Sequence, residues 1–175
     1  MTEFLNEENI ELHRDYVGRL ALRYSILEKS IFGISGKRID EILRMSLSRS
    51  ERGDILELLP EIELHRLYFQ SFAKRKNTMS GRLRADFGNE AAFLNGLYRL
   101  AIGMKRGFVT VNIRGAKIEC LAVEDYTECF TRGVPILAID ACEHAYFRDY
   151  GFDKHNYLVN ALSYLNLSLI DKNMN

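Results

Sequence analysis

The spacing of apolar residues changes along this chain from a helical period to a strand period, and this change limits the possible folds most strongly. From Asn6 to about Phe32 apolar residues recur at steps of three and four, as on one face of an amphipathic helix. After residue 107 the segment FVTVNI alternates in steps of two, as a strand does. Helices followed by a small antiparallel sheet indicate an α+β fold rather than repeated βαβ units.

Three helical segments are expected in the first part of the chain. Asn6 is a suitable N-cap for the first, and two glutamates follow in its first turn. A short second segment begins near Ile39 and precedes the polar run SLSRSERGD, which we expect to form a loop or a hairpin tip. The third begins at Pro60, which suits a first helical turn. We predict an N-terminal antiparallel helical hairpin domain, 1–77, and a C-terminal α/β domain, 78–175.

The second part is expected to contain a small sheet between helices. A helix is predicted over 90–104 and another over 153–170. The predicted strands are 108–113, 117–123 and 134–140, with a turn between the first two. The expected architecture is a small three-stranded antiparallel sheet wrapped by helices.

Charge and apolar content exclude several kinds of partner. The chain has 24 Lys and Arg residues and 24 Asp and Glu residues, so its net charge gives no reason to expect a nucleic acid. No apolar run approaches the roughly 18 residues of a membrane span, and the acidic N-terminus lacks the features of a signal peptide. The three cysteines have no CxxC spacing and are expected to be free thiols. We therefore predict a cytoplasmic protein that binds neither nucleic acid nor membrane.

Three of the four histidines and one aspartate are candidates for a metal site. His13 and His65 lie in the apolar stripes of two helices, Asp140 closes an apolar strand, and His144 follows four residues later. Singly, a buried histidine usually bonds to the backbone, and a strand-end aspartate often caps a helix. Together, three imidazoles and one carboxylate without a thiolate suit Mn, Fe or Zn.

Several motifs resemble those of the iron/manganese superoxide dismutases. The run DACEHAYF, which begins at Asp140, resembles the family signature D-x-W-E-H-A-Y-Y. ELHRLYFQSF resembles the segment N-H-x-x-F-W, RADFGNEAAF resembles D-F-G-S-x-x-x-F, and NEENIELH resembles the start of the first helix. The resemblance implies activity on superoxide or another small molecule and one Fe or Mn per chain. The implied ligands are His13, His65, Asp140 and His144.

The first helix can be aligned in two registers. HRDYVGRL also resembles a family segment, H-x-x-Y-V-x-x-L, that lies five residues beyond the ligand. That register would place Glu8 at the ligand position and would keep Tyr16 as the tyrosine at the entrance of the site. We prefer His13 as the ligand, because this register keeps the capping position of the family. It implies that a histidine and a tyrosine of the family become Val17 and Ala21.

Residues that surround the metal in the family differ here. The tryptophan of the signature is replaced by Cys142. The glutamine that bonds metal-bound solvent corresponds to Glu119 by analogy with the manganese enzymes, and to Glu61 by analogy with the iron enzymes. We expect Glu119, which shares a strand face with Leu121 and Val123, to point at the metal and to weaken dismutation. A solvent-facing position is an equal alternative for Glu61.

Glu143 precedes His144, as in the E-H pair that joins two subunits in the family, and so implies a homodimer. A glutamate at a helix start is also favoured by the helix dipole alone. The expected function is that of a superoxide dismutase; the alternatives are a metalloprotein on the same fold with a different redox or hydrolytic activity, and a non-catalytic binding subunit. The residues do not distinguish Fe from Mn or Zn.

Overall fold

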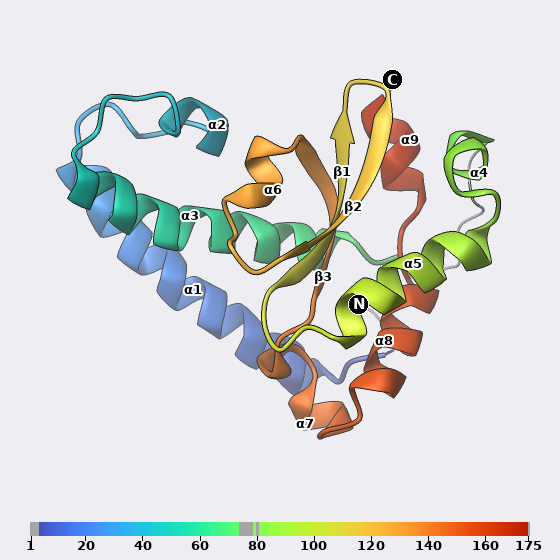
Figure 1. The fold of residues 1–175 in the computed structure, drawn as a ribbon. Helices are drawn as coiled ribbons and strands as arrows, with labels where there is room; N and C mark the ends of the chain where they lie inside the picture. Colours follow the sequence, from blue (N-terminus) through green and yellow to red (C-terminus); the bar gives the residue numbers. More distant parts are fainter. Residues whose placement is uncertain (1–3, 74–78, 80, 175) are drawn as a thin grey trace.

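The computed structural model describes residues 4–73, 79 and 81–174. These residues form an α+β fold in which one antiparallel sheet lies among helices (Figure 1). In chain order the elements are α1 (Glu7–Ser30), α2 (Ile39–Ile42), α3 (Arg49–Gln70), α4 (Gly81–Phe87), α5 (Glu90–Ile102), β1 (Phe108–Arg114), β2 (Lys117–Val123), α6 (Glu128–Thr131), β3 (Val134–Asp140), the 3₁₀ turn η1 (Glu143–Ala145), α7 (Phe147–Tyr150), α8 (Lys154–Ser163) and α9 (Ser168–Met174). The predicted fold class is confirmed. The predicted boundary between residues 77 and 78 lies outside the described residues and stays a prediction.

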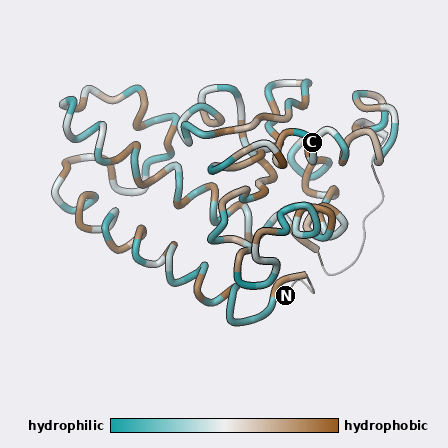
Figure 2. Tube along the Cα trace, turned by 60° about the horizontal axis from the view of Figure 1, so that its bottom comes forward, coloured by the Kyte–Doolittle hydropathy of each residue, from teal (hydrophilic) through white to brown (hydrophobic). Residues whose placement is uncertain are grey.

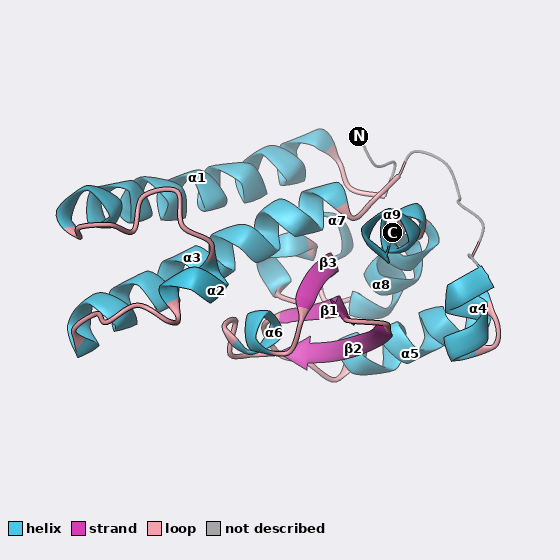
Figure 3. Cartoon of the chain, turned by 90° about the horizontal axis from the view of Figure 1, so that it is seen from above, coloured by secondary structure: helices cyan, strands magenta, loops and turns pink. Residues whose placement is uncertain are grey.

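The long helices α1 and α3 form the predicted hairpin and lie side by side, with α2 in their connection (Figures 1 and 3). Asn6 caps α1, because its side-chain oxygen accepts a hydrogen bond from the Asn9 backbone N–H at 2.7 Å. Hydrophilic and hydrophobic residues alternate along α1 in Figure 2, as expected of an amphipathic helix. Among the described helices, none has the length and apolar content needed to cross a membrane.

Helix α3 begins eleven residues earlier than we predicted, so the predicted loop over SLSRSERGD is limited to residues 46–48 and was wrong for the rest of the run. The Ser48 hydroxyl accepts a hydrogen bond from the Glu51 N–H, and the Glu51 carboxylate accepts one from the Ser48 N–H at 2.9 Å. This reciprocal capping box starts the helix before Pro60. Pro60 is buried inside the helix, where packing holds it despite the missing N–H.

The three predicted strands are confirmed, and they pair in the order β2-β1-β3. Val111 of the central strand pairs with Cys120 on one side and Leu137 on the other. Helix α3 packs against β3, and α5 packs against β1 and β2 (Figure 3). The sheet is therefore covered by helices from both parts of the chain, and Asp140, the last residue of β3, lies fully buried.

The predicted C-terminal helix is divided into α8 and α9. The break occurs where the backbone pairs with the segment that follows α3: the Ala73 N–H donates to the Tyr164 carbonyl at 2.9 Å, and the Asn166 N–H donates to the Ser71 carbonyl at 2.7 Å. These bonds replace helical ones. They join the end of the hairpin to the C-terminal helices.

Candidate metal centre

Four polar side chains meet where α1, α3 and the end of β3 come together. The ligand-type atoms of His13, His65, Asp140 and His144 all lie within 4.8 Å of one another. Asp140 Oδ2 lies 3.3 Å from His13 Nε2, 3.4 Å from His65 Nε2 and 2.9 Å from His144 Nε2. The first three side chains are buried, whereas the His144 side chain is 37% exposed. We call these four residues the histidine cluster.

Helical periodicity and the strand end place these side chains. His13 lies on the buried face of α1, in step with Ile10 and Leu20, and His65 is buried on α3. Hydrogen bonds fix both the backbone and the side chain of Asp140. Its carbonyl accepts a hydrogen bond from the Tyr157 hydroxyl, and its Oδ1 accepts one from the Cys142 N–H, both at 2.8 Å. The Oδ2 atom is thereby left to face the imidazoles.

Hydrogen bonds within the described residues do not satisfy the histidine cluster. Both ring nitrogens of His13 and the Oδ2 of Asp140 are buried without a hydrogen-bond partner, because their close neighbours lack hydrogen-bond geometry. His65 Nδ1 donates to the Glu61 carbonyl at 2.8 Å, which leaves Nε2 to face the cluster. Each unpaired buried group costs about 1–3 kcal/mol. A bound cation would satisfy His13 Nε2 and Asp140 Oδ2, which face each other, and three imidazoles with one carboxylate fit Fe, Mn or Zn.

The electrostatics of the cluster also favour a cation. Burial alone would raise the pKa of Asp140, but the three adjacent imidazoles hold it well below its usual range. Burial lowers the pKa of His13. For His144, burial is outweighed by the Asp140 carboxylate, with a further contribution from Glu61, and the pKa is raised. The ionised Asp140 carboxylate is the form that binds a metal, whereas at His144 a metal would have to compete with a proton.

Tyr16 and Glu61 border the cluster. The Tyr16 ring centroid lies 5.5 Å from that of His65 and 5.0 Å from that of His144. The Tyr16 hydroxyl donates a hydrogen bond to Glu61 Oε1 at 2.6 Å. Glu61 lies one turn before His65 on α3 and is half-buried. Its carboxylate is therefore engaged beside the cluster, which differs from the solvent-facing alternative.

The structure brings His13, and not Glu8, into the cluster. Glu8 is exposed and forms an ion pair with Arg148. Tyr16 lies three residues after His13 on the same side of α1, so it borders the cluster in the preferred register as well. We had linked Tyr16 only to the alternative register, although the three-residue spacing was a signal that it faces the same way as His13.

The expectation that Glu119 points at the metal was wrong. Its carboxylate forms an ion pair with Arg132, and its side chain is 36% exposed. Glu119 lies on the outer strand β2, and β1 separates that strand from β3 and Asp140. We had argued that this carboxylate needs a cation. The cation is Arg132, which follows α6 and returns to the strand through tertiary contacts that strand alternation does not reveal.

Cys142, which replaces a tryptophan of the family motif, is buried next to the cluster. Its Sγ accepts a hydrogen bond from the Gly107 N–H at 3.0 Å. Burial, together with the nearby Asp140 carboxylate, raises the pKa of this thiol to about 12. The thiol is therefore protonated at neutral pH and is a poor ligand in that state.

Two further residues near the site were not found from the sequence. The Asn9 side-chain amide is buried and donates to the Ala145 carbonyl at 3.1 Å and to Asp149 Oδ2 at 2.8 Å, which connects α1 to the segment that carries His144. The i, i+4 spacing from Asn9 to His13 was an available signal. Tyr126 is half-buried, and its ring lies 5.6 Å from that of Phe108, which itself packs against His65.

Glu143 lies in η1 and is exposed, as are two nearby aromatic residues of the next turn. The Phe147 side chain contacts Phe152 edge to face, with ring centroids 5.1 Å apart. Phe152 is 86% exposed. Glu143, His144, Phe147 and Phe152 are thus all exposed within one short stretch of the chain.

Comparison with protein families agrees with this site. The model for the C-terminal domain of the iron/manganese superoxide dismutases matches residues 75–173, more than half of the chain. The chain belongs to the iron/manganese superoxide dismutase family. Among curated proteins no match is found. The matched region contains Asp140 and His144, whereas His13 and His65 precede it and are joined to it by the fold.

Proposed function

We propose that this protein binds one Fe or Mn ion per chain at the histidine cluster and converts superoxide to dioxygen and hydrogen peroxide. One observation carries the proposal: buried donor atoms of His13 and Asp140 have no partner among the described residues, and they face two further imidazoles. Such a cluster is costly unless it holds a cation. Family membership supports Fe or Mn as the metal. Three imidazoles and one carboxylate are also donors that suit both metals.

When bound, the metal would supply the one-electron redox chemistry that dismutation requires. The residues of the chain would bind it and fix the orientation of the ligands. The Cys142 N–H holds one oxygen of Asp140, and the Glu61 carbonyl fixes the tautomer of His65. The Tyr16 hydroxyl keeps a proton at the border of the cluster, hydrogen-bonded to the Glu61 carboxylate.

We further propose that dismutation is weak. The Glu61 carboxylate occupies the position that the resemblance assigns to a neutral glutamine in the iron enzymes. A negative charge there favours the more highly charged state of a bound cation, and so opposes the half-reaction in which the metal is reduced. The Glu61 carboxylate, with the buried thiol of Cys142, also supports a second candidate function: a metalloprotein on this fold that carries out another redox or hydrolytic reaction.

The proposed assembly is a homodimer. His144 is the one member of the cluster whose side chain is exposed, and Glu143, Phe147 and Phe152, which are close to it in the sequence, are exposed as well. A second copy packed on this surface would cover the aromatic rings and shield the site from solvent. A cytoplasmic location and the lack of a nucleic-acid partner remain predictions from the sequence.

The function is tested by a dismutation assay on Fe-loaded and Mn-loaded protein, with Asp140→Ala as the inactive control. We expect dismutation by at least one metal form and none by the variant. Stoichiometric metal without dismutation in either form would contradict the proposed reaction and favour the second candidate. Activity that survives in Asp140→Ala would contradict the assignment of the site.

A further inference from the structure

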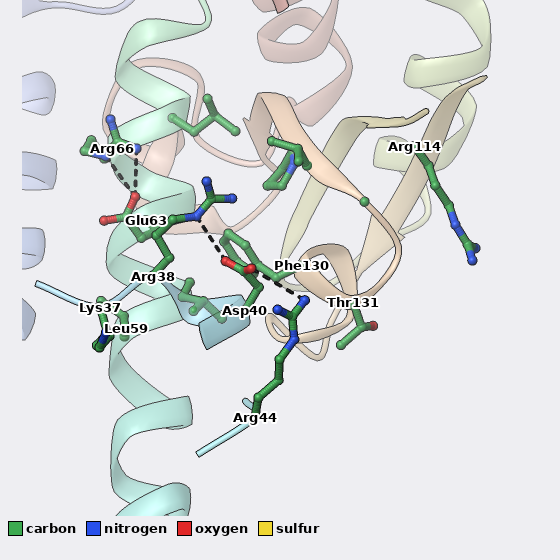
Figure 4. Close-up of a pocket in the computed structure, with 15 residues that line it drawn as sticks. Lys37, Arg38, Asp40, Arg44, Leu59, Glu63, Arg66, Arg114, Phe130 and Thr131 are labelled. Carbon is green, nitrogen blue, oxygen red and sulfur yellow. Dashed lines mark hydrogen bonds and ion pairs between the residues drawn. The ribbon is translucent and has the colours of Figure 1, made fainter. Parts of the chain in front are cut away.

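A cavity of about 620 Å³ lies between α2, α3, α6 and the start of β3 (Figure 4). None of the four residues of the histidine cluster lines it. The cavity reaches β3 at Val134 and Pro135, whereas Asp140 is at the other end of the strand, roughly 20 Å away at about 3.3 Å per residue. The cavity is thus a different site from the histidine cluster, although Glu63 and Arg66 of its lining flank His65 along α3.

The lining of this cavity is strongly basic. Its cationic side chains are Lys37, Arg38, Arg44, Arg66 and Arg114, and its acidic ones are Asp40 and Glu63. Outside the lining, Glu41 offsets Lys37 at 3.5 Å. Five cations against three carboxylates leave a surplus of positive charge at one opening, in a chain with no net charge.

The arginines of the lining outnumber the carboxylates that pair with them. Asp40 contacts both Arg38, at 3.0 Å, and Arg44, at 3.8 Å, as the dashed lines in Figure 4 show. Arg66 pairs with Glu63 at 2.8 Å. Arg114 has no ion pair with any residue that the structure describes, and it is exposed at the far side of the cavity. Guanidinium groups that share one carboxylate, or that have no ion pair, can still donate bidentate hydrogen bonds to an anion.

The inner wall is apolar. Ile39 and Leu59 are buried there, and Phe130 is half-buried and packs against buried apolar residues that include Ile39 and Leu59. Figure 4 shows Phe130 next to Asp40, between the two sides of the cavity. An aromatic face beside several guanidinium groups suits a ligand with a flat apolar part and a multiply charged anionic part.

We propose that this cavity binds a nucleoside di- or triphosphate, with the phosphates on Arg44, Arg38 and Arg114 and the base against Phe130. The volume lies within the range of about 300–1,000 Å³ that is usual for small-molecule sites. Arginine forks match phosphate oxygens, and bases stack on aromatic rings. The inference does not depend on the metal centre or on dismutation.

The test is a calorimetric titration of the metal-loaded protein with ATP, inorganic tripolyphosphate and adenosine. ATP should bind one site per chain, more tightly than either of the other two, and its affinity should fall as salt is raised. No heat of binding for ATP at millimolar concentration would overturn the proposal. Equal affinity for ATP and tripolyphosphate would overturn the role given to the base.

The double variant Arg44→Gln with Arg114→Gln locates the site. Both residues are exposed, and the one ion pair involved is weak, so the variant should fold normally. ATP affinity should fall by about tenfold or more, as expected for lost charge-assisted hydrogen bonds. Arg19→Gln, an exposed arginine of α1 outside the cavity, should change it by less than about twofold. ATP binding that survives the double variant but is lost in Asp140→Ala would place the anion at the histidine cluster and overturn the proposal.

Discussion

The Tyr16 hydroxyl donates a hydrogen bond to Glu61 Oε1 at 2.6 Å, which places one carboxylate charge beside the histidine cluster. Burial raises the pKa of Tyr16 well above its ordinary value, and the bond to Glu61 adds to this effect. Tyr16 therefore stays protonated over the physiological range. The pair joins α1 to α3 at the border of the site.

Replacing Glu61 by glutamine should raise dismutase activity. The substitution keeps an acceptor for Tyr16 but removes the charge that opposes metal reduction. We expect an increase of up to about tenfold, which corresponds to about 1.4 kcal/mol in activation free energy, with unchanged metal content. Steady-state dismutation with metal analysis measures both. Glu119→Gln is the control and should change activity little, because Glu119 pairs with Arg132. A decrease in Glu61→Gln, or an equal increase in the control, would contradict the role of Glu61.

Asn9→Ala should weaken the connection between α1 and the segment that carries His144. The buried Asn9 amide makes two hydrogen bonds, and its loss leaves the Ala145 carbonyl without this donor. The free energy of unfolding should fall by about 1–3 kcal/mol, measured by urea denaturation. Asn95→Ala, at an exposed position of α5, should cause little change. Equal stability of the two variants would show that Asn9 does not hold these elements together.

The cysteines should resist alkylation in the folded protein. Burial raises the pKa of Cys120, Cys129 and Cys142 to about 12. Because each pKa is raised, the thiolate fraction at pH 8 is only about 10⁻⁴ and grows about tenfold for each unit of rising pH. Mass spectrometry after iodoacetamide treatment should find slow labelling at pH 8 and rapid labelling in urea. Rapid labelling of Cys129 or Cys142 in folded protein at pH 7 would contradict their buried positions.

The protein should be a dimer at micromolar concentration, and Phe147→Arg should make it monomeric. The charge would lie in the proposed interface, next to Phe152, which Phe147 contacts. Phe32→Arg is the matched control, since Phe32 is fully exposed just after α1. Sedimentation velocity distinguishes the two states. A monomeric wild type, or the same dissociation in both variants, would contradict the proposed surface.

Local patterns predicted most of the fold. The strands were found nearly to the residue, because β-branched alternation and a turn at Gly115 leave few alternatives. His13 and His65 were found because helical periodicity places both on buried faces. The start of α3 was missed because the general preference of Pro60 for a first turn was given more weight than the capping pair of Ser48 and Glu51.

The errors around the site arise from tertiary contacts. Glu119 looked uncompensated on its own strand, but Arg132 reaches it after a turn and a short helix. Asn9 bonds to Ala145 and Asp149 far along the chain, and no spacing rule identifies those partners. Sequence patterns thus show which residues are buried. They do not show which ion pair a charged residue forms, because its partner is set by tertiary packing.

The central claim, a metal ion held by the histidine cluster, is tested most directly by counting Fe and Mn per chain in purified protein and in two histidine variants. His65→Ala removes a buried member of the cluster, whereas His155→Ala removes an exposed histidine that contacts Tyr98. Circular dichroism establishes that both variants are folded. We predict about one metal ion per chain in the wild type and in His155→Ala, and loss of most of it in His65→Ala. Wild-type protein that takes up no stoichiometric metal in Fe- or Mn-supplemented medium, or full retention by folded His65→Ala, would contradict the claim.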